Sequence, residues 1–282
     1  MPPAPVIIVD HDRAHGEFVA AVLEAAGVEA VVVESDCDVP RTRAPWPGAH
    51  GRRTEIVSAI EDGAFRTVFQ PMVALYKSEV VGYEALTRFD DGIGPDQWFA
   101  DASALGIGPE LELATIRLAV AAAHALPAGR FVTINLSPEL LLSRRDDLRV
   151  AISPLLDDRP VVLELTEHDV IEDYEALRAS LAALGPQVQL SVDDAGAGFS
   201  TLRHVVMLDP EYVKLDRAWV TEIQDDPTRQ ALVAGLSHFA RTTGCELVAE
   251  GIESEPEREM LTELDVSLGQ GYLLGAPSAT ND

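Results

Sequence analysis

Residues 131–139, FVTINLSPE, contain the pattern that decides the fold of this chain. An apolar stretch suited to a β-strand ends in Asn135, and Ser137 followed by Pro138 is a good helix start. An apolar strand with a polar end recurs at VVLELTE (161–167), VQLSVDD (188–194), YVKLD (212–216) and ELVAEGI (246–252). Apolar strands that alternate with helices predict a parallel sheet that is covered on both faces.

The same alternation extends in both directions along the chain. TVFQPMVAL (67–75) and EVVGYEALTRF (79–89) predict two strands around a turn, and SLGQGYLLG (267–275) predicts a last extended segment. Helices are expected at 54–63, 111–126, 139–152, 172–184, 217–240 and 255–264. About eight strands in about 220 residues predict an α/β fold, a TIM-like (β/α)8 barrel that is irregular at its start.

The chain before this barrel has a different organisation. VIIVD (6–10) and VEAVVVE (28–34) predict two strands around a helix at 15–26, a βαβ-like segment too small to bury a core alone. It loosely resembles the opening of a response-regulator receiver domain, and a remodelled structural segment is the favoured interpretation. The domain prediction is therefore a βαβ-like segment at 1–38, a Pro- and Gly-rich linker at 39–53 and a barrel domain at 54–278.

The composition excludes several classes of function. The 282 residues include 47 acidic and 21 basic side chains, for a net charge of −26, so binding to a DNA or RNA polymer is not expected. No apolar run approaches the roughly 20 residues of a membrane helix, and the N-terminus has no signal-peptide pattern. The two cysteines give no disulfide framework. A cytoplasmic protein is expected.

Polar residues stand at the ends of the predicted strands, and in a barrel such residues emerge together at the carboxyl-terminal mouth, where active sites form. They are Glu84, Asn135, Glu164, Asp193, Asp194, Lys214, Glu250 and Gln270. Carboxylates crowded at one mouth repel each other, and divalent cations would cancel that repulsion. Because the set supplies oxygen ligands without His or Cys, it favours Mg²⁺ or Mn²⁺ over Zn²⁺.

The adjacent pair Asp193 and Asp194 would let one carboxylate bridge two ions while its neighbour holds the second. Two metals about 3.5–4 Å apart clamp the attacking and leaving oxygens of phosphoryl transfer. Lys214 would orient a water or stabilise charge on the phosphate, and Glu250 would accept a proton from the attacking water.

Each of these residues also has a structural explanation. A single strand-end Glu is often a solvated residue or a helix cap. Asp193 and Asp194 could belong to a glycine-rich turn, and Lys214 with Asp216 could form a surface ion pair of little energetic value. The joint occurrence of all eight residues at equivalent barrel positions favours a site.

Eight ordered motifs carry a resemblance to a known family. They are FQPMV (69–73), GYEALTR (82–88), INLSP (134–138), ELTE (164–167), DDAGAGFS (193–200), VKLD (213–216), AEGIE (249–253) and QGY (270–272). The chain resembles the EAL domain family of cyclic di-GMP phosphodiesterases over about residues 54–278. Eight motifs in order are far more specific than one short motif.

The resemblance implies a TIM-like barrel and a hydrolase that uses two Mg²⁺ or Mn²⁺ ions to convert cyclic di-GMP to linear pGpG. It assigns metal binding to Glu84, Asn135, Glu164, Asp193 and Asp194, and catalysis to Lys214 and Glu250. It assigns substrate contacts to Gln70, Arg88 and Gln270, and support of the loop after Asp194 to Glu167 and Glu253. The rigid guanidinium fork of Arg88 suits a phosphate.

Two departures from the family pattern bear on these expectations. DDAGAGFS has Ala195 and Ala197 where the usual pattern resembles DDFGTGYS. The family links this loop to metal binding and dimer contacts, so we expect a looser loop with weaker activity or weaker homodimerisation. The segment after Arg88 is shorter and more acidic than expected, which would alter the guanine pocket. The alternatives are a cyclic di-GMP-binding signalling module that does not cleave, and a hydrolase of another phosphate ester.

Overall fold

A computed structural model describes residues 6–10, 30–34, 49–165, 171, 173–195 and 199–279. Contacts divide the chain into two units, Met1–Gly48 and Ala49–Asp282. In the first unit β1 (Val6–Asp10) pairs in parallel with β2 (Ala30–Glu34), which agrees with the two expected strands. The helix expected at 15–26 lies outside the described residues, and the assignment of this segment as a separate domain stays a prediction.

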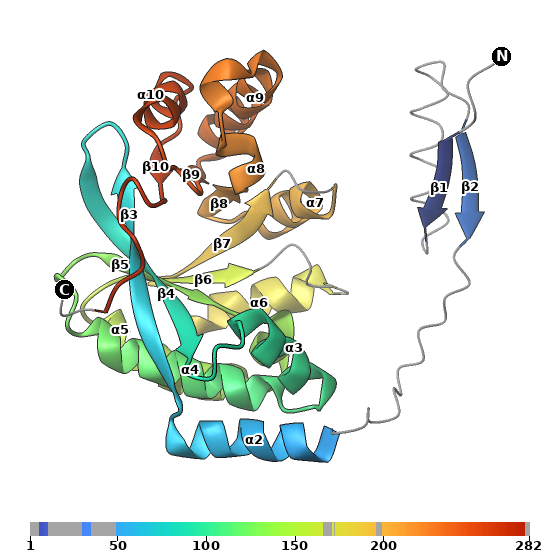
Figure 1. Ribbon diagram of the computed structural model, residues 1–282, viewed down its shortest axis with the longest axis vertical. Coiled ribbons are helices and arrows are strands. Elements are labelled where there is room, and N and C mark those ends of the chain that lie inside the picture. The colour runs from blue at the N-terminus through green and yellow to red at the C-terminus, as the bar shows by residue number, and fades with distance from the viewer. Residues whose placement is uncertain are drawn as a thin grey trace. The chain divides into compact units, whose positions relative to one another are not determined.

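The second unit is a closed eight-stranded barrel with helices outside it (Figure 1). Its strands are β3 (Phe65–Ala74), β4 (Glu79–Phe89), β5 (Phe131–Asn135), β6 (Val161–Leu165), β7 (Val188–Ala195), β8 (Tyr212–Leu215), β9 (Glu246–Ala249) and β10 (Leu268–Gly269). They follow chain order around the barrel, and β10 closes it between β9 and β3. β3 runs antiparallel to β4 and β10, and the other neighbours are parallel. The expectation of a TIM-like barrel with an irregular start is confirmed.

The helices differ from the expected set at several points. They are α2 (Ala49–Asp62), α3 (Pro95–Ala104), α4 (Gly108–Ala123), α5 (Pro138–Leu156), α6 (Tyr174–Leu184), α7 (Phe199–Leu208), α8 (Arg217–Val220), α9 (Pro227–Thr243) and α10 (Glu255–Glu263). The last five residues of the expected linker, 49–53, belong to α2. We expected neither α3 nor α7. Among the described helices none is long and apolar enough to cross a membrane.

The single helix expected at 217–240 is wrong. The chain forms α8, then a 3₁₀ turn at Ile223–Asp225, and then α9. Pro227 lacks a backbone N–H and suits the first turn of a helix, and the Asp226 carboxylate accepts hydrogen bonds from the N–H groups of Thr228 and Arg229. A new helix therefore begins at Pro227 and the earlier one cannot continue through it.

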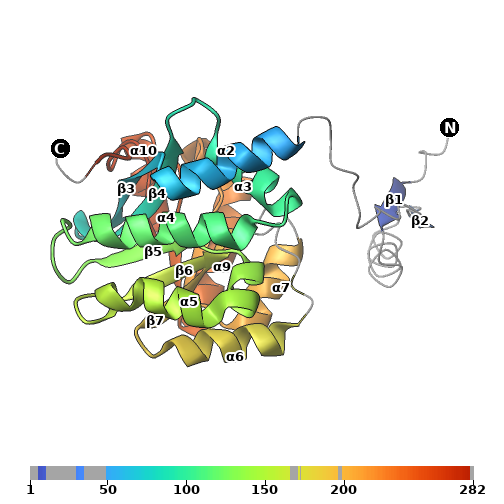
Figure 2. The ribbon, with the colours of Figure 1, turned by 90° about the horizontal axis from the view of Figure 1, so that it is seen from below.

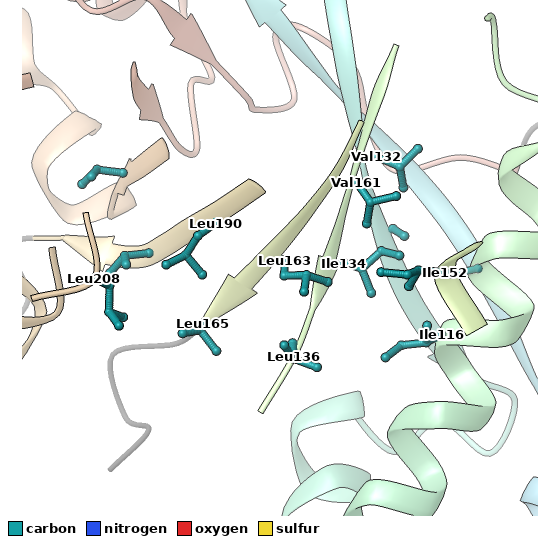
Figure 3. Packing of buried hydrophobic residues seen from close by; sticks show 14 of the residues in the cluster. Ile116, Val132, Ile134, Leu136, Ile152, Val161, Leu163, Leu165, Leu190 and Leu208 are labelled. Atoms are coloured by element: carbon teal, nitrogen blue, oxygen red, sulfur yellow. The ribbon is translucent and has the colours of Figure 1, made fainter. Parts of the chain in front are cut away.

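Side chains alternate between the two faces of each barrel strand. Val132 and Ile134 of β5 point out of the barrel, as do Val161 and Leu163 of β6, and they pack with residues of the surrounding helices such as Ile152 (Figure 3). Their neighbours in the sequence therefore face the barrel axis. This alternation directs Asn135 and Glu164 into the barrel.

The barrel interior is apolar on the side opposite these polar residues. Met72, Phe131, Val162, Val248 and Leu268 form a buried cluster there. The ring of Phe131 needs the absence of a side chain at residue 82, because a Cβ on Gly82 would lie 2.3 Å from it. This apolar cluster closes one end of the barrel interior. Glu164 beside it is fully buried, whereas Asn135 at the end of β5 is exposed.

Candidate active site

Lys214 is the centre of the polar cluster. Its neighbours Val213 and Leu215 pack outward, so its side chain points into the barrel, where only 2% of it is exposed. Its Nζ lies 2.5 Å from Glu164 Oε1, 2.7 Å from Glu250 Oε1, 3.5 Å from Asp193 Oδ1 and 3.7 Å from Glu84 Oε1. Four carboxylates from four parts of the chain thus surround one ammonium group.

Amide side chains hold the other side of this cluster. Gln270 Nε2 donates to Glu84 Oε2 at 2.6 Å and to Gln70 Oε1 at 2.9 Å. Asn135 Nδ2 donates to Glu84 Oε1 at 3.3 Å. Gln70 Nε2 in turn donates to the carbonyl of Gly275 at 3.2 Å. Both oxygens of Glu84 are therefore held by residues that are distant in the sequence, Asn135 and Gln270.

Burial and mutual repulsion change the protonation chemistry of the cluster. Burial raises the pKa of Glu164 well above its usual range, although Lys214 acts in the opposite direction. Burial also raises the pKa of Glu250 to about 7, with smaller contributions from the charges of Asp193 and Glu84. Burial alone would lower the pKa of Lys214, but the surrounding carboxylates outweigh it and raise that pKa well above its usual range. The ammonium group therefore stays charged while Glu250 titrates near neutrality.

The stability of the metal-free protein should fall as pH rises through this range. A carboxyl group whose folded pKa exceeds its unfolded pKa stabilises the fold fully below the unfolded value and loses that contribution as pH rises through the folded value. For Glu250 the window runs from the ordinary 4.5 to about 7, and the loss is about 3 kcal/mol at most. Denaturant unfolding at pH 5 and 8 in EDTA should show the decrease, and Glu250→Gln should reduce it. A pH dependence that is identical in Glu250→Gln would contradict the assignment.

The residues present fit divalent cations by their donor chemistry. They offer hard oxygen ligands, and Glu164 Oε2 is buried without a hydrogen-bond partner, as expected of a ligand oxygen. In the described part of the chain, no three His, Cys, Asp or Glu side chains gather into a metal site by themselves. The carboxylates instead surround the nitrogen of Lys214. Asp194 follows Asp193 in β7, but its side chain lies outside the described residues.

A cavity of about 300 Å³ lies beside the cluster. Its lining combines the cluster acids Glu84 and Glu250 with two cationic groups, Arg88 and Arg217. Arg88 Nη1 donates to the carbonyl of Thr87 at 2.9 Å. Gln70, Leu86, Gly251, Glu253, Gln270, Gly271, Tyr272 and Pro277 complete the lining. The cavity thus offers arginine donors to an anion next to a cluster of carboxylates.

The Arg217 side chain packs closely against Gly251 at the edge of this cavity. A Cβ on Gly251 would lie 2.5 Å from the Arg217 side chain, and the φ of +68° at Gly251 is itself unfavourable for other residues. Arg217 Nη2 pairs with Glu253 Oε1 at 2.8 Å, with both side chains well exposed. Glu253 is thus placed at the cavity edge. Its expected support of the loop after Asp194 stays a prediction, because residues 196–198 lie outside the described part.

The structure therefore brings together ten of the twelve residues singled out from the sequence. Those in the cluster or lining the cavity are Gln70, Glu84, Arg88, Asn135, Glu164, Asp193, Lys214, Glu250, Glu253 and Gln270. Of the other two, Glu167 and the side chain of Asp194 lie outside the described residues. Sequence reasoning missed Arg217 and Tyr272 as cavity residues, although both come shortly after a motif residue, Lys214 or Gln270.

Glu112 supports the chain directly after Asn135 and was also missed. Its carboxylate accepts from the backbone N–H of Ser137 at 2.8 Å and from Ser137 Oγ at 2.7 Å. Ser137 Oγ in turn caps α5 by accepting from Leu140 N–H. We expect Glu112→Ala to lower the free energy of unfolding by about 1–3 kcal/mol, because a partly buried N–H loses its acceptor. Denaturant melts should show Glu110→Ala, an exposed neighbour on α4, to be nearly neutral; equal losses would contradict this role.

Comparison with known proteins relates this chain to a family of bacterial relatives. The family model for the EAL domain matches residues 53–277. The probable cyclic di-GMP phosphodiesterase PdeN of Escherichia coli is 29% identical over 81% of this chain and 46% of its own length. The cyclic di-GMP phosphodiesterase RocR of Pseudomonas aeruginosa is 28% identical over 79% of this chain and 60% of its length. The chain thus matches less than two thirds of the length of either relative.

Solved structures agree with the sequence comparison. The PaMucR phosphodiesterase in complex with cyclic di-GMP superposes with a TM-score of 0.67 at 28% identity, over 81% of this chain and 97% of that one. Klebsiella pneumoniae BlrP1, in a complex with manganese and cyclic di-GMP, shares the fold with a TM-score of 0.69 at 23% identity, over 97% of this chain and 88% of that one. With a family model that covers most of the chain and a barrel of the matching architecture, this chain belongs to the EAL domain family.

Proposed function

We propose that this chain hydrolyses cyclic di-GMP to linear pGpG with the help of two Mg²⁺ or Mn²⁺ ions. The observation that carries the proposal is the cluster of four carboxylates around Lys214, which opens beside a cavity that contains Arg88. Relatives that are named cyclic di-GMP phosphodiesterases, and the PaMucR complex with that nucleotide, support the choice of substrate.

The reaction adds water across one phosphodiester bond of the cyclic dinucleotide. The water oxygen forms a bond to phosphorus, the bond from phosphorus to the 3′ oxygen breaks, and a proton passes to that oxygen. Bound divalent ions would lower the pKa of the attacking water and offset charge on the phosphate oxygens. Glu84, Asn135, Glu164 and Asp193, together with Asp194, would hold those ions.

The remaining residues of the site have separate roles in this proposal. Arg88 presents a planar fork of donors to a phosphate. Glu250 borders the cavity and can take the proton of the water. Lys214 Nζ, 2.7 Å from Glu250 Oε1, keeps that carboxylate oriented and supplies positive charge beside the phosphate. Gln270 fixes Glu84 through their hydrogen bond of 2.6 Å.

Chromatography of nucleotides after incubation of cyclic di-GMP with the full chain and Mg²⁺ or Mn²⁺ tests the proposal. We expect pGpG to appear with either ion and not in EDTA. Calorimetry should accompany the assay, because Ala195 and Ala197 depart from the usual loop sequence. Tight binding without pGpG would instead identify a signalling module that senses the nucleotide, and neither binding nor product would reject cyclic di-GMP as the ligand.

A further inference from the structure

Arg88 is carried by a part of the barrel wall that has little support from neighbouring strands. The ladder between β4 and β5 ends at Ala85, opposite Ile134. From Leu86 to Phe89 the described ladder partners of β4 are in β3 alone. Arg88 therefore stands on a two-stranded extension, and other contacts must fix the position of its backbone.

The indole of Trp98 in α3 makes those contacts. Its ring stacks on the ring of Phe89, the residue that follows Arg88, with centroids 4.2 Å apart and planes 1° from parallel. Its Nε1 donates to Asp91 Oδ2 at 3.1 Å, two residues further along. Only 3% of Trp98 is exposed. One side chain thus holds the chain at two points just beyond Arg88.

Arg52 of α2 fixes the indole in turn. Its guanidinium carbon lies 4.1 Å from the centroid of the Trp98 ring, within the range of a cation–π contact. Its Nε pairs with Asp101 at 2.8 Å and its Nη1 with Glu55 at 2.9 Å. The guanidinium plane is therefore held by α2 and α3 together, which contact each other outside the barrel (Figure 2).

This cluster is separate from the main hydrophobic core. Phe89 and Trp98 belong to a smaller group of buried residues, with the others being Ile56, Ala59, Phe65, Ala102, Ile107 and Leu111. Because side chains alternate along β4, a Phe89 ring that is fixed in this group directs Arg88 to the opposite face. That face is the cavity.

We propose that Trp98, held by Arg52, is a positioning residue for Arg88 and so sets the affinity of the site for the phosphate of its substrate. This inference rests on the proposed function. The core of the metal-binding cluster does not depend on Trp98, because Glu84 and Glu164 each have ladder partners in both neighbouring strands. A looser Trp98 therefore weakens substrate binding and leaves the metal requirement unchanged.

Steady-state kinetics of Trp98→Leu with cyclic di-GMP tests this role. We expect KM to rise about tenfold, since small displacements of a positioning group have effects of this size, while kcat and the Mn²⁺ concentration for half-maximal activity change less than twofold. Trp98→Phe keeps the stack on Phe89 and should restore most of the affinity. Phe239→Leu, an aromatic truncation in α9 far along the chain, is the matched control and should leave KM unchanged.

A double-mutant cycle with Arg88→Ala separates positioning from general destabilisation. If Trp98 acts through Arg88, Trp98→Leu will have no further effect on kcat/KM in the Arg88→Ala background. Additive effects in the cycle would overturn the inference. A Trp98→Leu variant in which kcat and the melting temperature both fall while KM rises would overturn it as well, because that pattern indicates general destabilisation. Wild-type protein that neither binds nor cleaves cyclic di-GMP would reject the proposed function instead. The two failures are distinct, because the first is read from wild type alone and the second only from the variants.

Discussion

Lys214→Met will destabilise the metal-free protein by about 3–5 kcal/mol, the usual effect of removing one partner from a buried ion pair. The ammonium group faces Glu164, which is fully buried, and Glu250, Asp193 and Glu84. Without it these carboxylates repel each other, and the fully buried Glu164 has little water to screen its charge. Denaturant unfolding in EDTA measures the loss.

Divalent cations should restore much of this stability. Because Mn²⁺ would bind the same carboxylates in the folded state only, it would add about 2.7 kcal/mol at a concentration 100 times its Kd. The gain in melting temperature on adding Mn²⁺ should be larger for Lys214→Met than for wild type, since ion and ammonium group offset the same charge. Lys77→Met, at an exposed turn position, is the control and should stay within about 0.5 kcal/mol of wild type. Equal stability of Lys214→Met and wild type in EDTA would contradict this account.

The barrel and the gathering of its polar residues follow from sequence patterns alone. Side chains alternate along a strand, and parallel strands bring their carboxyl ends to one edge of a barrel. The pattern of VVLELTE therefore places Glu164, and that of YVKLD places Lys214, at the same mouth, although 50 residues separate them. The eight motifs then identify the family, which the match over residues 53–277 confirms.

The depth of each residue in the barrel was beyond sequence reasoning. Glu164 and Lys214 stand inside their strands, one residue before the ends at Leu165 and Leu215, whereas Glu250 follows the end of β9 at Ala249. This difference decides which groups are fully buried. The possibility of a surface ion pair between Lys214 and Asp216 is wrong for this reason, since Lys214 is buried.

Two other features of the structure, the direction of β3 and the support of Arg88, differ in how far the sequence could predict them. The short turn at 75–78 connects β3 and β4, and a turn of this length joins antiparallel strands only, so the reversed direction of β3 follows from loop length. The support of Arg88 by Trp98 and Arg52 joins three elements through side-chain stacking. Such contacts depend on how helices pack outside the barrel, which no periodic pattern in the sequence specifies.

Glu84→Gln should have opposite effects on activity and stability. The carboxylate of Glu84 accepts from Gln270 at 2.6 Å and from Asn135 at 3.3 Å, and its Oε1 lies 3.7 Å from Lys214 Nζ. The neutral amide of the substituted glutamine cannot replace a charged metal ligand. We therefore expect turnover of cyclic di-GMP to fall by at least about 100-fold and Mn²⁺ binding measured by calorimetry to weaken.

The same substitution removes one negative charge from a group of four carboxylates that share a single ammonium. The free energy of unfolding in EDTA should therefore stay equal or rise, which excludes misfolding as the cause of lost activity. Glu79→Gln is the matched control, because Glu79 is the first residue of the same strand and pairs with Arg130 at the surface. Full turnover in Glu84→Gln would reject Glu84 as a metal ligand. Lower stability together with lost activity would show that the Glu84 carboxylate is needed for folding. That result would contradict our expectation that this negative charge serves activity and does not stabilise the metal-free fold.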